Sequence, residues 1–429
     1  MADIVIIGAG LAGVPCAYEL RRQLGAGHRI TVVAPSHHFD FIPANSWLAL
    51  GWRKPEEAQV DLREPMAKQD IALVEQAAIG INPAAQQVTL QNGDVIAYDQ
   101  LVVAAGPVCA FDKIPGLGPA STDGYTQALT THAQAVEAWE AWKQFPLNPG
   151  PIVVGVAPES AAFGPAAEFA LMMDEELRRQ KIRHLAPITF FTPEPYPGHF
   201  GTGEKSGSRQ FVEGQFERRN IKAITNARLN AIVPGALHLT RYSDAGIRLA
   251  DEELLFHYAM VFPSYRGPGI ASDLPAACDS SGFLRVDAHQ RCIGYPNVWA
   301  VGANVAAAPA AWTPVPLSVP KIGRNIEGMV RTVCTNLTAT VNGHAIVATQ
   351  AWVSQCLADY GGQGEVLGRL QKTNAAAKAE DSGRWLQLVK IAYEKYFLDQ
   401  VRDGVAAPPY QPDLRENLKG GWQNGTERH

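Results

Sequence analysis

Short runs of apolar, mostly β-branched residues alternate with longer mixed stretches in the first part of the chain. An apolar run at 4–7 is followed by a segment from about 11 to 24 that favours a helix, and a second apolar run follows at 29–33. Strands that are apolar throughout are typical of parallel sheets buried on both faces. The order therefore predicts a strand, a helix and a parallel strand, which together form a βαβ unit.

The same order occurs again later in the chain. Residues 152–156 form another buried-strand run, a helix is predicted from about 165 to 181, and a further strand follows at 188–192. Two such units, far apart in the sequence, predict an α/β protein with two Rossmann-like domains.

Two more strands return the chain to the first sheet. The stretch 98–106 follows a hairpin turn predicted at 92–94 and ends at Gly106, and the strand predicted within 296–304 ends at Gly302. Helices are predicted over about 322–337 and, with an amphipathic pattern, over 384–398. The predicted domains are 1–107 together with 266–344, then 108–265, and a C-terminal helical region at 345–429.

The turn after the first strand carries the most informative motif of the chain, which reads Gly8-Ala-Gly10-Leu-Ala-Gly13. Gly8 permits a tight turn, Gly10 lets a pyrophosphate approach the backbone, and Gly13 lets the next helix pack closely against the strand. The N–H groups at the start of that helix would point at the phosphates. Because the motif lies between a strand and a helix, it predicts a dinucleotide site.

The rest of the nucleotide fingerprint is incomplete. The second strand ends without a carboxylate, and none occurs before Asp40, so backbone groups or Ser36 must hold the adenosine ribose. The turn at 155–164 in the second unit lacks the three-glycine pattern, and Pro158 occupies a place where a backbone N–H is needed. We therefore expect no effective NAD(P)H site in the second domain.

Composition excludes several classes of protein. The chain has 429 residues, a net charge of −5 and no basic tract, which argues against nucleic-acid binding. No apolar run is long enough for a transmembrane helix, and no signal peptide is expected, so we expect a cytoplasmic location or the periphery of the cytoplasmic membrane. No C-x-x-C pair occurs, and no metal site is expected. Most cysteines are expected to pack in the core: Cys16, Cys109, Cys278, Cys292 and Cys334.

Several short segments, spread over nearly the whole chain, are specific in combination. They are Phe39-Asp-Phe41-Ile-Pro43, Ala162-Phe-Gly164-Pro165-Ala-Ala-Glu168-Phe169, Glu194-Pro-Tyr196-Pro-Gly-His199, Thr313-Pro-Val-Pro316, Pro320-Lys321-Ile-Gly323 and Tyr393-Glu-Lys395-Tyr-Phe397. With them the chain resembles the sulfide:quinone oxidoreductases and the related flavin subunits of flavocytochrome c sulfide dehydrogenases. The resemblance implies two Rossmann-like domains of the disulfide-reductase flavoprotein type, one FAD, and electrons that pass from a reduced sulfur species to a quinone.

The resemblance also implies roles for individual residues. Cys356 would carry sulfur, and His132 and His199 would handle protons on the sulfide side. No cysteine lies near Pro43, where the flavocytochrome branch attaches its flavin, so FAD is expected to be noncovalent. The residues expected at the FAD are Gly8, Gly10, Gly13, Ser36, Ala105, Gly106, Gly302, Asn304 and Lys321, and those expected at the quinone are Phe41, Pro43, Tyr396 and Phe397.

The sequence departs from the family at the sulfur site. Ala162 stands where the family has its first redox cysteine, and the segment 128–130 lacks a further family cysteine. The second redox cysteine corresponds to Cys356. Because one thiol cannot cycle as a disulfide with itself, an alternative is a partner-dependent or sulfide-inactive electron-transfer subunit that works with a cytochrome or another redox subunit. A second alternative is a type-two NADH:quinone oxidoreductase, which the turn at 155–164 disfavours.

The end of the chain bears on how the protein associates with membranes. The segment 410–422 offers few apolar anchors among charged residues, so only weak contact with a membrane surface is expected. We also expect a homo-oligomer. Its small-molecule partners would be sulfide or another reduced sulfur species and a quinone.

Overall fold

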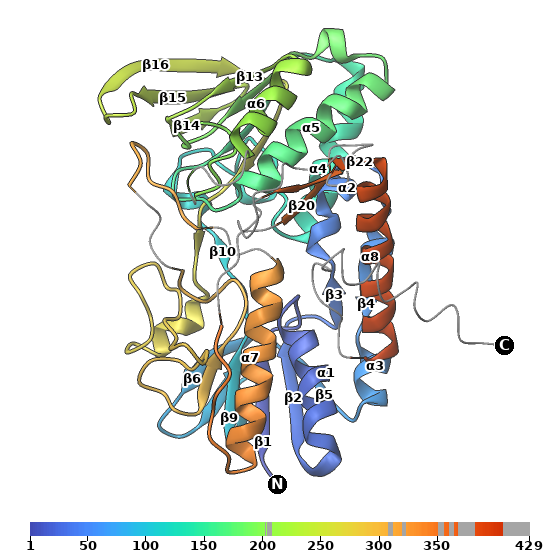
Figure 1. Cartoon of the computed structure of the whole chain (residues 1–429), viewed down its shortest axis with the longest axis vertical. Coiled ribbons are helices and arrows are strands. Elements are labelled where there is room, and N and C mark those ends of the chain that lie inside the picture. Colours follow the sequence, from blue (N-terminus) through green and yellow to red (C-terminus); the bar gives the residue numbers. More distant parts are fainter. Residues whose placement is uncertain are drawn as a thin grey trace, which may run out of the picture.

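The computed structural model describes residues 1–201, 203, 208–307, 312–319, 323–350, 356–359, 364–367 and 382–405. The chain is an α/β fold with two parallel sheets. Figure 1 shows the first sheet with helices α1 and α7 in the lower part of the view and the second sheet with α5 and α6 above it, while α8 runs along one side. The predicted fold class is confirmed.

The first sheet is parallel, with the strand order β19-β9-β1-β2-β5. Its central strand is buried from Ile4 to Ile7, which agrees with the apolar run in the sequence. The antiparallel strands β6, β7 and β8 form a separate sheet, and the hairpin predicted at 92–94 joins β7 to β8. The elements are β1 (Asp3–Ile7), α1 (Gly13–Leu24), β2 (Arg29–Ala34), β5 (Ala72–Glu75), β6 (Ala78–Asn82), β7 (Gln87–Leu90), β8 (Val95–Ala97), β9 (Gln100–Val103), β19 (Val298–Ala300) and α7 (Gly323–Val341).

Short elements lie between β2 and β5, and α8 (Arg384–Asp403) packs on them. This helix contacts β4 and α3, and the predicted amphipathic helix at 384–398 is thereby confirmed and extended. Among the described residues, no helix combines the length and apolar character that a membrane span requires. The short elements are β3 (His38–Asp40), α2 (Asn45–Ala49), β4 (Gln59–Asp61) and α3 (Arg63–Lys68).

The second sheet is also parallel, in the order β13-β12-β11-β17, and a three-stranded antiparallel sheet adjoins it in sequence. The strands and the helix predicted from 152 to 192 are confirmed as β11, α5 and β12, with ends that differ by at most two residues. The elements are α4 (His132–Gln144), β11 (Ile152–Val156), α5 (Phe163–Arg179), β12 (Ile188–Phe191), α6 (Ser208–Arg218), β13 (Ile221–Ile224), β14 (Ala227–Val233), β15 (Ala236–Tyr242), β16 (Arg248–Leu255) and β17 (Tyr258–Phe262).

The chain crosses between the two sheets twice. The two crossing segments, β10 (Val108–Cys109) and β18 (Tyr265–Arg266), pair with each other as antiparallel strands. The domain boundaries predicted at 107/108 and 265/266 fall at these crossings. The boundaries themselves stay predictions, because a crossing point does not show that each part folds alone.

The C-terminal region differs from the expectation in one respect. The sequence predicted only helical structure there, whereas an antiparallel sheet precedes α8. Its strands have four residues or fewer, too short to produce a recognisable alternation of apolar and polar positions. Cys356 is therefore the first residue of a strand. The strands are β20 (Cys356–Asp359), β21 (Gly364–Leu367) and β22 (Ser382–Gly383).

Candidate active site

The carboxyl ends of three neighbouring strands meet at one edge of the first sheet. Ile7 of β1 pairs with Val103 of β9, which pairs in turn with Ala300 of β19. Ligands of open parallel sheets bind at this edge, in the crevice beyond the strand ends. The structure therefore brings together the predicted cofactor residues that follow these strands: Gly8, Gly10, Ala105, Gly106 and Gly302.

The three glycines of the first turn have different surroundings. A Cβ atom on Gly8, which has a φ of +107°, would lie 2.4 Å from the carbonyl oxygen of Ala104, and one on Gly13 would lie 1.8 Å from the carbonyl oxygen of Gly8. A Cβ on Gly10 would meet no protein atom within 4 Å. Two glycines are thus required by the backbone itself, whereas Gly10 faces open space of the kind a pyrophosphate needs.

The start of α1 is open to an anion. The residue before the helix, Ala12, provides no side-chain cap, and the first turn contains no acidic residue. The first N–H groups of a helix have no partner within the helix, and their dipole favours negative charge. Together with the open side of Gly10, this helix start fits a dinucleotide pyrophosphate.

Asn304 lies at the same edge and is completely buried. Its Nδ2 donates a hydrogen bond of 3.0 Å to the carbonyl oxygen of Val103, which ties the end of β19 to β9. Its Oδ1 has no hydrogen-bond partner among the described residues. A buried acceptor without a partner is costly, and a hydroxyl of a bound cofactor would satisfy it.

The cofactor contacts predicted for Ser36 and Lys321 stay predictions. Ser36 is exposed, and its Oγ accepts a hydrogen bond of 3.1 Å from the backbone N–H of His38, so its contact with a ribose stays a prediction. Lys321 lies outside the described residues.

The corresponding turn of the second sheet is occupied by the chain itself. A Cβ on Gly155 would lie 1.9 Å from the ring of Phe191, so this glycine serves internal packing. Beyond it, the N–H of Glu159 donates to the carbonyl oxygen of Pro316 at 2.8 Å, and the carbonyl of Ser160 accepts from the N–H of Ser318 at 3.1 Å. The N–H of Glu159, a donor of the kind that a pyrophosphate would use, is thereby bonded within the chain. The absence of an effective NAD(P)H site in the second domain stays a prediction.

The residues predicted on the sulfide side come from neighbouring loops. Ala162 directly precedes α5, and His199 follows β12, which pairs with β11. Both residues are buried, and burial lowers the pKa of the His199 imidazole. The strand that begins at Cys356 contacts α5. The side chain of Cys356 lies outside the described residues, so its sulfur chemistry stays a prediction.

His132 is the first residue of α4 and is 8% exposed. Its Nδ1 atom has no hydrogen-bond partner among the described residues. The pairing of His132 and His199 in one proton path stays a prediction.

Sequence reasoning missed Cys109, which was expected to be an ordinary core cysteine. Its thiol is only partly buried and hydrogen-bonds Thr130 and Gln134, while Tyr265 bonds Thr130 at 3.2 Å between hydroxyl oxygens. Burial raises the pKa of the Cys109 thiol. A thiol therefore adjoins the segment that lacks a family cysteine, and no signal in the sequence reveals it, because β10 and that segment are distant along the chain.

Of the residues predicted at the quinone, Phe41 and Phe397 lie in one aromatic cluster, whereas Tyr396 is exposed. The rings of Phe41 and Phe397 lie 5.2 Å apart between centroids, and Phe39 packs against Phe397 at 5.8 Å. Pro43, in the turn after Phe41, is half-buried. Tyr396 is 52% exposed and is not among the aromatic contacts of this cluster. A contact of these residues with quinone stays a prediction.

Truncation of Phe397 is expected to destabilise the protein strongly. Phe397 is completely buried, so Phe397→Ala is expected to cost about 3–5 kcal/mol through lost burial and a cavity. The neighbouring change Tyr396→Ala should alter stability by only about 0.5 kcal/mol, because that side chain is half exposed. Urea unfolding of both variants measures the difference. Equal midpoints would show that α8 does not dock through Phe397.

The comparisons with known proteins agree with this geometry. The sequence profile of the pyridine nucleotide-disulphide oxidoreductase family matches residues 2–316. The sulfide-quinone reductase of Aquifex aeolicus is 34% identical over 96% of this chain and 94% of its own length. The mitochondrial sulfide:quinone oxidoreductase of Schizosaccharomyces pombe is 22% identical over 80% of this chain and 76% of its own.

A solved structure extends the similarity to three dimensions. The crystal structure of the sulfide:quinone oxidoreductase from Aquifex aeolicus superposes with a TM-score of 0.87 at 32% identity, covering 100% of this chain and 96% of that one. The chain is an oxidoreductase of the pyridine nucleotide-disulphide oxidoreductase family and belongs there with the sulfide-quinone reductases.

Proposed function

We propose that this protein transfers electrons from sulfide, or another reduced sulfur species, through FAD to a quinone. The observation that carries the proposal is the near full-length similarity to the Aquifex aeolicus enzyme in both sequence and structure. The open edge of the first sheet supports the proposal, because an FAD-dependent reaction needs a dinucleotide site and this edge provides one.

Bound FAD would supply an acceptor of an electron pair that can pass the electrons on. Different residues of the chain would hold different parts of the FAD. Gly10 and the N–H groups at the start of α1 would receive the pyrophosphate, and Asn304 Oδ1 would accept a hydroxyl hydrogen. We infer noncovalent attachment, since no cysteine occurs near Pro43 in the sequence.

On the sulfide side, the chain supplies proton handling and one sulfur. Burial lowers the pKa of His199, so its imidazole is neutral at pH 7 and can accept the proton that hydrogen sulfide releases as it becomes a nucleophile. Cys356 would carry the sulfur. Ala162 cannot contribute a second sulfur, so sulfur transfer must proceed through Cys356 with a small-molecule acceptor or through another thiol of the chain.

The proposal is tested by anaerobic mixing of the FAD-loaded protein with sulfide. Sulfide is expected to bleach the visible flavin band, and a soluble quinone is expected to restore it. The Cys356→Ser variant should lose the reaction, whereas Cys278→Ser, a partly exposed cysteine in a different part of the fold, should retain it. A flavin that stays oxidised in the presence of sulfide would overturn the proposal.

NADH serves as the parallel donor in the same experiment. No rapid bleaching by NADH is expected, because the backbone of Glu159 and Ser160 is already bonded to the segment at 316–318. Rapid reduction by NADH would instead favour a type-two NADH:quinone oxidoreductase.

One observation favours a second function. The absence of a cysteine at Ala162 fits an electron-transfer subunit that receives electrons from a partner such as a cytochrome. Ala162→Cys separates the two functions: if the missing thiol limits sulfide oxidation, the flavin of this variant should be reduced by sulfide faster than that of the natural protein.

We further propose a homo-oligomer with weak contact to the cytoplasmic membrane surface. Size-exclusion chromatography would measure the oligomeric state, and vesicle sedimentation would measure the membrane contact.

A further inference from the structure

A buried carboxyl group, to which no role has been assigned above, lies beside the His199 loop. Glu194 follows β12 at the carboxyl edge of the second sheet, and its backbone carbonyl accepts from the N–H of Asn226 at 2.8 Å. The side chain is 1% exposed. In a nucleotide-binding domain an acidic residue near this place would face a ribose, but here it is turned into the protein.

The buried carboxylate is used by its own loop. Its Oε1 accepts a hydrogen bond of 2.6 Å from the backbone N–H of Phe200, and the N–H of His199, which donates to the carbonyl oxygen of Tyr196 at 3.3 Å, is shared with the carboxylate. Its Oε2 accepts from the hydroxyl of Thr192 at 2.7 Å. Glu194 therefore holds two consecutive backbone amides, one of them belonging to His199.

The loop needs such an anchor because its backbone is strained. Phe200 has a φ of +52°, a left-handed conformation that is unfavourable for a bulky residue. Gly198 has a φ of +92°, and a Cβ there would lie 2.7 Å from the carbonyl oxygen of Ser208. The Ser208 hydroxyl donates to the Gly198 carbonyl at 2.7 Å, which fixes the other side of the turn to α6.

The anchored turn sets the surroundings of the His199 ring. The His199 ring meets the Tyr196 ring edge to face, with 5.2 Å between the ring centroids. The guanidinium of Arg209 lies over the same Tyr196 ring, 4.5 Å from its centroid. Burial lowers the pKa of His199, and burial raises the pKa of Glu194 to about 7. Both shifts favour neutral side chains, so the loop keeps an uncharged imidazole in a protected place.

We propose that Glu194 is the positioning residue of His199: by binding the amides of His199 and Phe200 it fixes the strained turn that places the imidazole. This inference rests on the proposed function for the catalytic use of His199. The placement of the loop by Glu194 is independent of the proposed function, and it can be measured separately.

Hydrogen exchange tests the placement without any turnover. In Glu194→Ala, amide exchange in the peptide that spans 194–201 is expected to accelerate about tenfold or more, because the amide of Phe200 loses its buried acceptor and that of His199 keeps only the carbonyl oxygen of Tyr196. Glu194→Gln keeps an acceptor oxygen and should retain most of the protection. Glu217→Ala, which removes an exposed glutamate near the other end of α6, is the matched control and should leave this peptide unchanged. Unchanged exchange in Glu194→Ala would overturn the proposal.

Flavin reduction by sulfide tests the action through His199. Glu194→Ala is expected to slow this step about tenfold or more, and Glu194→Gln is expected to rescue it. In the His199→Ala background, Glu194→Ala should cause no further loss, because both changes remove the same placed imidazole. Additive losses would overturn the proposal. If the natural protein is not reduced by sulfide, the proposed function fails, while the exchange experiment still decides whether Glu194 places the loop.

Discussion

Gly10→Ala is expected to abolish tight FAD binding while leaving the apoprotein folded, whereas Gly13→Ala is expected to disrupt the fold itself. A methyl group on Gly10 meets no protein atom within 4 Å, and this residue does not need a positive φ. Its added carbon would enter only the space assigned to the pyrophosphate. The apoprotein should therefore change in stability by only about 1 kcal/mol or less.

The same methyl group on Gly13 has no room. It would lie 1.8 Å from the carbonyl oxygen of Gly8, a backbone atom at the end of the central strand. Relief requires α1 to move away from β1, which exposes the core between them and should cost about 3 kcal/mol or more. Gly13→Ala should therefore lower the unfolding midpoint of the apoprotein and also lose flavin.

Two measurements on each variant distinguish these effects. Urea unfolding of the apoprotein reports the fold, and the flavin absorbance of the protein after reconstitution reports the cofactor. A Gly10→Ala protein that retains full FAD affinity would show that the cofactor does not lie against this turn. A Gly13→Ala protein as stable as the natural one would show that α1 and β1 are farther apart than the structure has them.

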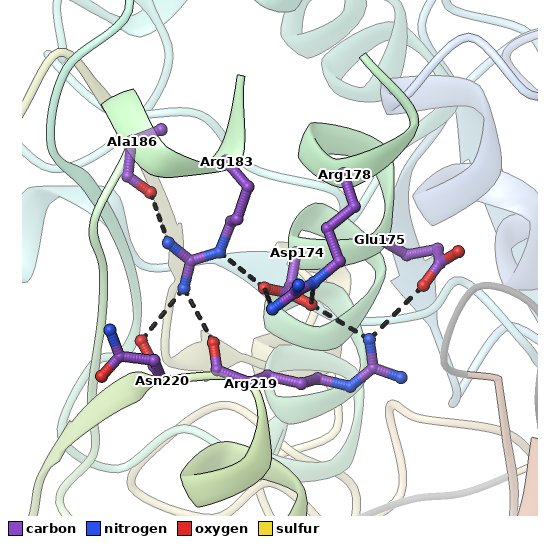
Figure 2. Close-up of polar contacts among 7 residues, drawn as sticks. All are labelled: Asp174, Glu175, Arg178, Arg183, Ala186, Arg219 and Asn220. Carbon is purple, nitrogen blue, oxygen red and sulfur yellow. Dashed lines mark hydrogen bonds and ion pairs between the residues drawn. The ribbon is translucent and has the colours of Figure 1, made fainter. Parts of the chain in front are cut away.

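Asp174→Ala is expected to destabilise the protein by about 3–5 kcal/mol. Figure 2 shows Asp174 of α5 between three arginines. The carboxylate lies 2.8 Å from Arg178, 2.5 Å from Arg183 and 3.0 Å from Arg219, and its side chain is completely buried. Its removal takes this buried counter-charge away from Arg178 and Arg183 and leaves Arg219 with the carboxylate of Glu175, 3.5 Å away.

The network joins separate parts of the second domain. Arg183 also donates to the carbonyl oxygen of Ala186 at 2.9 Å and to those of Arg219 and Asn220 at 2.9 and 3.0 Å (Figure 2). Asp174 thereby holds the end of α5 against the segment that connects α6 to β13. Its loss should loosen the helices that cover this face of the second sheet, while leaving the glycine turn of the first sheet intact.

The dependence on pH provides a further readout. Burial would raise the pKa of Asp174, but the three arginines lower it below its ordinary value. A carboxyl whose pKa is lower in the folded state contributes stability above its unfolded pKa of about 3.9, and that stability is lost as pH falls through the folded-state pKa. Thermal unfolding of the natural protein should therefore show a steeper loss of stability in acid than that of Asp174→Ala.

Control variants separate the buried pairs from the exposed one. Arg178 is 50% exposed, whereas Arg183 is 14% exposed, so Arg183→Ala should cost more than Arg178→Ala. Equal effects, or an Asp174→Ala protein of natural stability, would contradict the expectation that this network anchors the outer helices.

Much of the fold could be predicted because its signals are local. The apolar runs at 4–7 and 152–156 are long enough to identify buried strands, and the hairpin at 92–94 is defined by its turn residues. The strands β20 to β22 were missed, since segments of four residues or fewer carry too little pattern. Local signals therefore identified the two sheets and failed in the C-terminal region.

The residues of the candidate site also divide into those with a local sequence signal and those without one. Spacing alone identified Gly8, Gly10 and Gly13, because a nucleotide turn needs small residues at fixed intervals. Nothing local showed that Cys109 adjoins Thr130, because contacts across the fold decide which side chains meet.

By itself, the sequence determined the two βαβ units, the dinucleotide turn, and the family, because each depends on residues a few positions apart or on motifs in a fixed order. Only the tertiary structure decided that Gly10 alone of the three glycines faces open space, that Asp174 gathers three arginines, and that Glu194 is buried beneath His199. Burial, charge pairing and pKa depend on neighbours that are distant in sequence, so they are fixed only when the chain has folded.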